Sequence, residues 1–222
     1  MDPFRISLAL GPLAVYLVVL GGMNLMRRPF VVSGTRDTAA LGLALFGLIL
    51  VGPFELFYPS SASSLFGPFV WGFLASLYGL SVVLVLLSQR PRLVIYNIAV
   101  EELRAIMADL VEGLDGIEGL EGETQWAGDS LSLPKLGLQL HIDASSAMRN
   151  VSLVSSGPHQ NYLGWRKLQI ELSKALRQFK VRRNLRASWF LLIGLTFICL
   201  IVGMVAYDPQ LVAQAMMEMI QR

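Results

Sequence analysis

Four apolar segments, each long enough to cross a membrane as a helix, constrain this chain more than any other feature. They are residues 6–26, 39–58, 68–88 and 187–207, and Glu55 is the only Asp, Glu, Lys or Arg within them. About 20 consecutive apolar residues in a helix span the roughly 30 Å hydrocarbon core of a bilayer. A mean hydropathy of +0.57 and a charged fraction of 15% also favour lipid over water as the solvent. We therefore predict a multi-pass α-helical membrane protein with four transmembrane helices.

The basic residues predict how these helices are oriented. Only Arg5 and Arg222, among the 18 Lys and Arg residues, lie outside the connections between spans one and two and between spans three and four. Connections rich in Lys and Arg stay in the cytoplasm. Both connections are therefore expected to be cytoplasmic and both termini external, in the cytoplasmic (inner) membrane.

A basic cluster directly precedes the fourth span. Its members are Arg166, Lys167, Lys174, Arg177, Lys180, Arg182, Arg183 and Arg186. Basic side chains at this position are attracted to anionic lipid head groups. We predict a membrane-surface cluster, on a helix that continues without a break into the fourth span. No nucleic-acid partner is expected, because the sequence carries no reading motif beside the charge.

Residues 92–180 have the pattern of a small water-soluble domain. The segment "RLVIYN" is rich in β-formers, residues 100–114 have helical periodicity, three short alternating segments follow, and residues 165–179 form a second amphipathic stripe. We predict a two-layer α/β domain of order β-α-β-β-β-α, with both helices on the Leu138 face of a four-stranded sheet. The chain is thereby divided into a three-helix membrane region (1–91), the α/β domain (92–180), the fourth span (181–207) and a tail helix (208–222).

The tail helix has a clear start signal. Asp208 can accept a first-turn amide, and Pro209 suits the first helical position. An apolar stripe follows, so the external tail should lie on the membrane surface, against the helix bundle or on another chain.

Small residues predict how the spans pack. Ala40 with Ala44, Gly72 with Ser76, and Ala75 with Gly79 lie on common helix faces. Such faces allow membrane helices to approach closely. A compact bundle is expected, either alone or as part of a homo-oligomer.

Candidate functional residues are few. Glu55 is an ionisable residue in an apolar segment, which makes it a candidate intramembrane functional carboxylate. Ser155, Ser156 and Gly157 precede the second predicted helix of the domain and form a candidate anion-binding loop. His141 and Asp143 share a strand face, but no nucleophile accompanies them in a recognisable pattern. No metal or cofactor site is predicted.

These features predict a non-catalytic interaction or assembly module, anchored in the membrane. Its polar sheet face and the acidic segment 112–123 are expected to meet a protein partner. Two alternatives stay open, a transport or channel component that uses Glu55 and a sensor of small anions or nucleotides at residues 155–157.

Overall fold

The computed structural model describes residues 3–56, 58, 66–115, 125–145, 149–157, 161–179, 181 and 184–221. It divides into two compact units. The first comprises residues 1–21, 38–89 and 189–222, and the second comprises residues 22–37 and 90–188. The chain therefore passes between the units four times, once at one end of each long helix.

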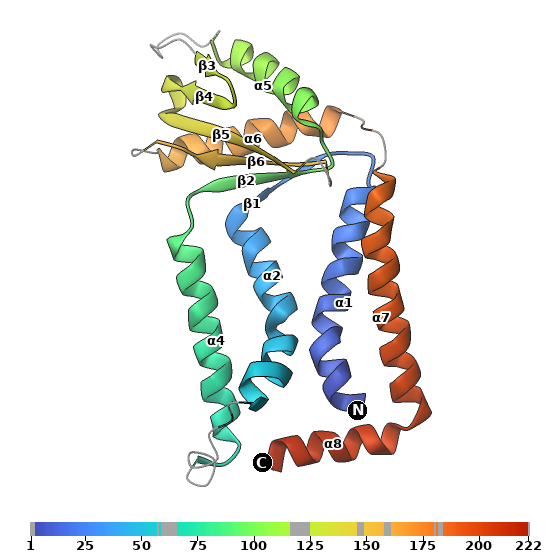
Figure 1. Cartoon of the computed structure of the whole chain (residues 1–222). Coiled ribbons are helices and arrows are strands. Elements are labelled where there is room, and N and C mark those ends of the chain that lie inside the picture. Colours follow the sequence, from blue (N-terminus) through green and yellow to red (C-terminus); the bar gives the residue numbers. More distant parts are fainter. Residues whose placement is uncertain are drawn as a thin grey trace. The chain divides into compact units, whose positions relative to one another are not determined.

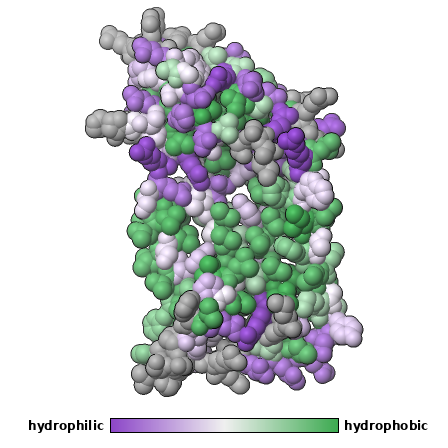
Figure 2. All heavy atoms as spheres, in the orientation of Figure 1, coloured by the Kyte–Doolittle hydropathy of each residue, from purple (hydrophilic) through white to green (hydrophobic). Residues whose placement is uncertain are grey.

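The first unit is built from long apolar helices and a short terminal one (Figure 1). They are α1 (Pro3–Leu25), α2 (Gly34–Ile49) with its π-helical extension Leu50–Phe54, α4 (Phe69–Ser88), α7 (Ser188–Tyr207) and α8 (Pro209–Gln221). Among the described residues, four helical stretches are long and apolar enough to cross a membrane, namely Pro3–Leu25, Gly34–Phe54, Phe69–Ser88 and Leu185–Tyr207. The prediction of four such helices is confirmed, and it indicates a membrane protein. On the face shown in Figure 2, hydrophobic residues cover these helices, whereas hydrophilic residues predominate over the second unit.

Close helix contacts occur at glycines that the sequence did not single out. A Cβ added at Gly47 of α2 would collide with the carbonyl oxygen of Leu8 in α1, and a Cβ added at Gly194 of α7 would lie 2.8 Å from Cγ2 of Val18 in α1. Gly72 and Gly79 of α4, which were predicted to lie at helix contacts, have open space beside them. Sequence spacing identifies faces where helices can approach, but which face is used depends on the arrangement of the other helices.

The second unit is a six-stranded antiparallel sheet with two helices. The strands are β1 (Phe30–Ser33), β2 (Arg92–Tyr96), β3 (Gln125–Ala127), β4 (Ser130–Leu133), β5 (Leu138–Ser145) and β6 (Asn150–Ser155), in spatial order β1-β2-β6-β5-β4-β3. The helices are α5 (Val100–Asp115) and α6 (Tyr162–Gln178). Leu138 and Leu140 of β5 share one buried core with Leu103 of α5 and with Leu168 and Leu172 of α6.

The strand count differs from the predicted four for two reasons. Strand β1 comes from the connection between the first two spans and pairs with β2, so that Phe30 lies opposite Tyr96. The segment predicted as one strand, residues 124–134, contains the hairpin of β3 and β4, which turns at Gly128 and Asp129. Gly128 has a φ of +62°, a conformation that glycine adopts without strain.

Helix α6 does not continue directly into the fourth span. It ends at Gln178, and Phe179 and Asn184 both have extended backbone conformations. Asn184 then accepts a hydrogen bond from the amide of Arg186 and starts a 3₁₀ turn that leads into α7. The prediction that α6 continues without a break into the fourth span is therefore wrong, because the chain leaves the helical conformation at Phe179 and a new helical turn starts at the Asn184 cap.

Candidate functional site

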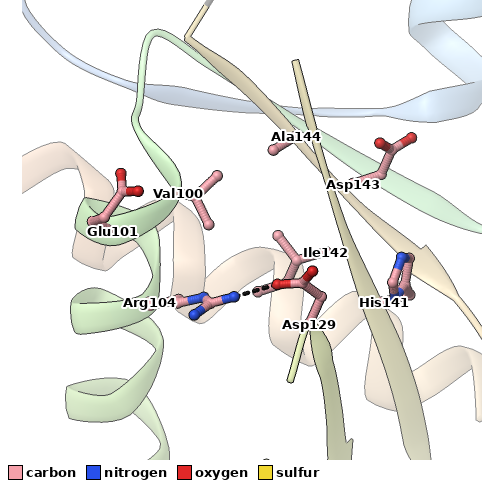
Figure 3. A pocket seen from close by; sticks show the side chains of 8 residues that line it. All are labelled: Val100, Glu101, Arg104, Asp129, His141, Ile142, Asp143 and Ala144. Carbon is pink, nitrogen blue, oxygen red and sulfur yellow. Dashed lines mark hydrogen bonds and ion pairs between the residues drawn. The ribbon is translucent and has the colours of Figure 1, made fainter. Parts of the chain in front are cut away.

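A pocket of about 440 Å³ in the second unit is a candidate binding site. It lies between the first turn of α5, the β3–β4 turn and strand β5 (Figure 3). Its lining consists of Val100, Glu101, Arg104, Asp129, His141, Ile142, Asp143 and Ala144.

The β3–β4 hairpin determines where this pocket lies. The hairpin ends beside β5 with Ser130 opposite His141, and the carbonyl of Asp129 accepts a hydrogen bond of 2.8 Å from the amide of Ile142. Strand β5 continues to Ser145, beyond the start of β4. Because backbone groups alternate in direction along a strand, the N–H and C=O of Ala144 point to the same side as those of Ile142. At that position β4 has already ended, so the pocket includes a short open strand edge.

The charges around the pocket are predominantly negative. Arg104 of α5 forms an ion pair with Asp129, and Glu101 and Asp143 add two further carboxylates. The side chains of Arg104 and Asp129 are 44% and 58% exposed, so water screens their attraction and a ligand could replace either partner at small cost. The lining of the pocket thus combines three carboxylates, one guanidinium and an open strand edge.

The start of α5 is held in place by contacts that the sequence analysis did not identify. Glu102 accepts a hydrogen bond of 3.0 Å from the amide of Ala99, and its two carboxylate oxygens accept bonds of 2.9 and 2.8 Å from Arg149. A Glu three residues after the helix cap is a recognisable signal for the first contact. The second contact involves a residue far along the chain. Together they fix the first turn of α5 and therefore the positions of Glu101 and Arg104.

His141 and Asp143 lie on the other side of β5 from Arg104 and Asp129 (Figure 3). The Nδ1 atom of His141 is 3.4 Å from the Oγ atom of Ser130. Asp143 follows two residues later on the same strand face, about 7 Å further along. This spacing does not give the carboxylate–imidazole–hydroxyl chain that general-base catalysis would need. Among the described residues, no group of three or more His, Cys, Asp or Glu could hold a metal ion.

The predicted anion-binding loop has its first two amides engaged. The amide of Ser155 donates to the carbonyl of Pro91 at 3.0 Å, and the amide of Ser156 donates to the carbonyl of Gln139 at 2.9 Å. The N-terminus of α6 is capped by Asn161, which accepts hydrogen bonds from the amides of Leu163 and Gly164. Anion binding at residues 155–157 stays a prediction, but these contacts do not favour it.

The described part of the basic cluster is exposed. Arg166, Lys167, Lys174 and Arg177 lie on the surface of α6, and Arg186 is exposed in the 3₁₀ turn before α7. Lys174 also pairs with Glu171 at 2.9 Å. Lys180, Arg182 and Arg183 lie outside the described residues, as does most of the acidic segment 112–123. Exposure is compatible with a membrane-surface role, which stays a prediction.

Glu55 forms an ion pair that the sequence analysis did not identify. Its Oε1 atom lies 2.5 Å from the Nη1 atom of Arg5, at side-chain exposures of 22% and 35% respectively. The π-helical turn at Leu50–Phe54, which includes Pro53, extends α2 and immediately precedes Glu55. Such turns have wider backbone spacing and change the direction in which the following side chains point. Arg5 thus joins the start of α1 to the residue that follows the π-helical extension of α2.

Comparison with protein-family models, with curated proteins and with solved structures found no match. The fold alone therefore indicates the class of protein. In the part of the chain that the structure describes, it combines four helices suited to a membrane with a separate six-stranded antiparallel sheet, which indicates a membrane protein with a folded unit beside its apolar helices.

Proposed function

We propose that this chain is a non-catalytic interaction or assembly module, anchored in a membrane and presenting its sheet-containing unit to a protein partner. The apolar helices of the first unit hold the chain in the bilayer. The second unit supplies the recognition surface, whose centre is the pocket beside β5. The single observation that carries this proposal is that pocket, formed by a unit that has its own hydrophobic core.

The proposed partner presents an extended segment with at least one Lys or Arg. The open edge at Ala144 offers backbone hydrogen bonds, which would give affinity without depending on sequence. The carboxylates of Glu101 and Asp129, on the α5 side of β5, would select a basic side chain, and Asp143 adds negative charge on the other side of the strand. The exposed ion pair between Arg104 and Asp129 would open when that side chain enters.

We also propose that the second unit lies on the cytoplasmic side of the inner membrane, with both chain termini external. The distribution of Lys and Arg supports this orientation. The exposed basic side chains of α6 and of the turn before α7 would then face a leaflet rich in anionic lipid.

Co-purification in mild detergent tests this function. The full-length chain is compared with the pocket variant Glu101→Gln/Asp143→Asn and with Asp109→Asn, a matched control on the exposed surface of α5. We expect the same partner to be recovered with the wild type and with Asp109→Asn, and to be lost with the pocket variant. A chain that brings down no partner, or whose partner is indifferent to the pocket charges, would contradict the proposal.

The transport alternative has less support from the structure. The ion pair with Arg5 gives Glu55 a helix-joining role, and a carboxylate held in this way is a poor carrier of protons or ions. The sensor alternative requires free amides at residues 155–157, where two are engaged by carbonyl groups.

A further inference from the structure

Helix α8 begins directly after α7, because Asp208 ends one helix and starts the next. The amide of Asp208 still bonds to the carbonyl of Met204 at 3.5 Å, while its carboxylate accepts a hydrogen bond of 3.0 Å from the amide of Leu211. Pro209, the first residue of α8, needs no partner for a backbone N–H. The short connection turns α8 crosswise to the long helices of the first unit (Figure 1).

The two sides of α8 differ in polarity and in exposure. With 3.6 residues per turn, Leu211, Val212, Ala215 and Met216 lie on one side and Gln210, Gln214 and Glu218 on the other. Val212 and Ala215 are half-buried, whereas the three polar residues are exposed. The apolar side therefore faces the rest of the first unit.

The helix bundle covers only the middle of this apolar side. Leu211 and Met216, which flank the half-buried pair, remain 44% and 41% exposed. Packing within the first unit thus leaves part of the apolar stripe open. A helix of 13 residues with an open apolar stripe needs a further apolar environment to be stable.

Aromatic side chains mark the end of the first unit at which α8 lies. Tyr58, after α2, stacks on Trp71 of α4 with ring centroids 4.9 Å apart. Tyr207, the last residue of α7, is 92% exposed. Tyr and Trp gather at the level of lipid head groups, where one part of the ring is in apolar surroundings and the other is wet. The ion pair of Arg5 and Glu55 lies at the same helix ends, so this end has the polarity of a membrane–water boundary.

We propose that α8 is an interfacial helix that binds the boundary between lipid head groups and acyl chains. Leu211 and Met216 insert into lipid beside the bundle, and Gln210, Gln214 and Glu218 face water. Between Asp208 and Gln221 the sequence carries two acidic residues and no Lys or Arg. Binding is therefore driven by apolar burial, and it does not require anionic lipid. This inference is independent of the function proposed for the pocket.

Site-specific fluorescence of the full-length chain in vesicles tests this inference. Cys199 is the only cysteine, so Cys199→Ala provides a background for Met216→Cys on the apolar side and Gln214→Cys on the polar side. Each cysteine carries an environment-sensitive nitrobenzoxadiazole label. The vesicles contain phosphatidylcholine alone or mixed with phosphatidylglycerol, and they include a lipid spin-labelled near its head group.

The two labels should respond in opposite ways. We expect the spin-labelled lipid to quench the label at position 216 roughly twofold or more over the label at position 214, since interfacial helices bury their apolar side about 5 to 10 Å deep. Iodide in the water should preferentially quench the label at position 214. The pattern should be the same in both lipid mixtures and at high salt. Equal quenching of the two labels, or lipid contact only with phosphatidylglycerol, would overturn the proposal. The proposal would also be overturned if the label at position 216 were shielded from iodide only at high protein density and lost this shielding on dilution into excess lipid. A second copy of the chain, and not lipid, would then cover the apolar side of α8.

Discussion

Gly194 offers a direct test of helix packing in the first unit. A Cβ added at this position of α7 would lie 2.8 Å from Cγ2 of Val18, 2.9 Å from the carbonyl oxygen of Ala14 and 3.0 Å from the backbone nitrogen of Val18. An ordinary van der Waals contact of a Cβ atom is 3.4 to 4 Å long, so each of these distances is at least 0.4 Å too short. Two of the three atoms belong to the backbone of α1, which cannot rotate away. Gly194→Ala must therefore push α1 and α7 apart.

The expected loss of stability follows from this displacement. Overpacking of this kind costs about 1 to 3 kcal/mol, while replacing a helical Gly by Ala stabilises a helix by roughly 0.5 to 1 kcal/mol. Gly203 lies on the same helix and has no atom within 4 Å of an added Cβ. Gly203→Ala should gain only the helical preference. Since that preference is common to both variants, the difference between their stabilities is the overpacking cost of about 1 to 3 kcal/mol.

Thermal unfolding in mild detergent, followed by tryptophan fluorescence, measures this difference. For a chain of about 150 to 250 residues, 1 kcal/mol corresponds to roughly 2 to 4 °C in Tm. We expect Gly194→Ala to unfold roughly 2 to 12 °C below Gly203→Ala. Equal transition temperatures would show that α1 and α7 do not approach each other at Gly194, and a lower value for Gly203→Ala would contradict the packing altogether.

Two further predictions concern single contacts in each unit. Asn161→Ala should lower the free energy of unfolding by about 1 kcal/mol, because it removes the side-chain cap that accepts hydrogen bonds from the amides of Leu163 and Gly164. Asn161→Asp keeps an acceptor at this position and should retain most of the stability. Thermal unfolding of the wild type and the two variants checks this, and an alanine variant as stable as the wild type would refute the capping role. Glu55→Gln should lower the free energy of unfolding by about 1 kcal/mol. In a chain that already carries Arg5→Gln, the same change should cost much less, because both substitutions remove the same ion pair. Additive losses in that double-mutant cycle would argue against the pair, and loss of an ion-dependent flux in vesicles at unchanged stability would favour the transport alternative.

Part of the second unit was accessible from sequence patterns. The alternation in β5 placed Leu138, Leu140 and Ile142 on one face, and these residues are buried in the core. The helical spacing of α6 identified Leu168 and Leu172 in the same core. These predictions succeed because the side-chain periods of strands and helices are local properties. The exposed Phe179, predicted on the α6 stripe, lies past the end of that helix.

The candidate site was only partly visible in the sequence. His141 and Asp143 were identified as neighbours on a strand face, but the pocket also needs Arg104 and Asp129, which no local pattern connects to them. The hairpin at Gly128 and Asp129 could have been recognised, because a two-residue loop with glycine is a common hairpin signal. The pairing of Arg149 with Glu102 joins the residue before β6 to the first turn of α5, and it has no such signal.

The sequence by itself determined the four apolar helices and the start of α8 at Asp208 and Pro209. Hydrophobic length and helix capping each depend on residues that are close along the chain. Only the tertiary structure decided that Phe30–Ser33 joins the sheet as β1, that Arg5 pairs with Glu55, and that Gly194 rather than Gly72 lies at a helix contact. Each of these contacts joins residues far apart in sequence, and pairings over such separations are selected by the packing of the whole unit rather than by any local preference.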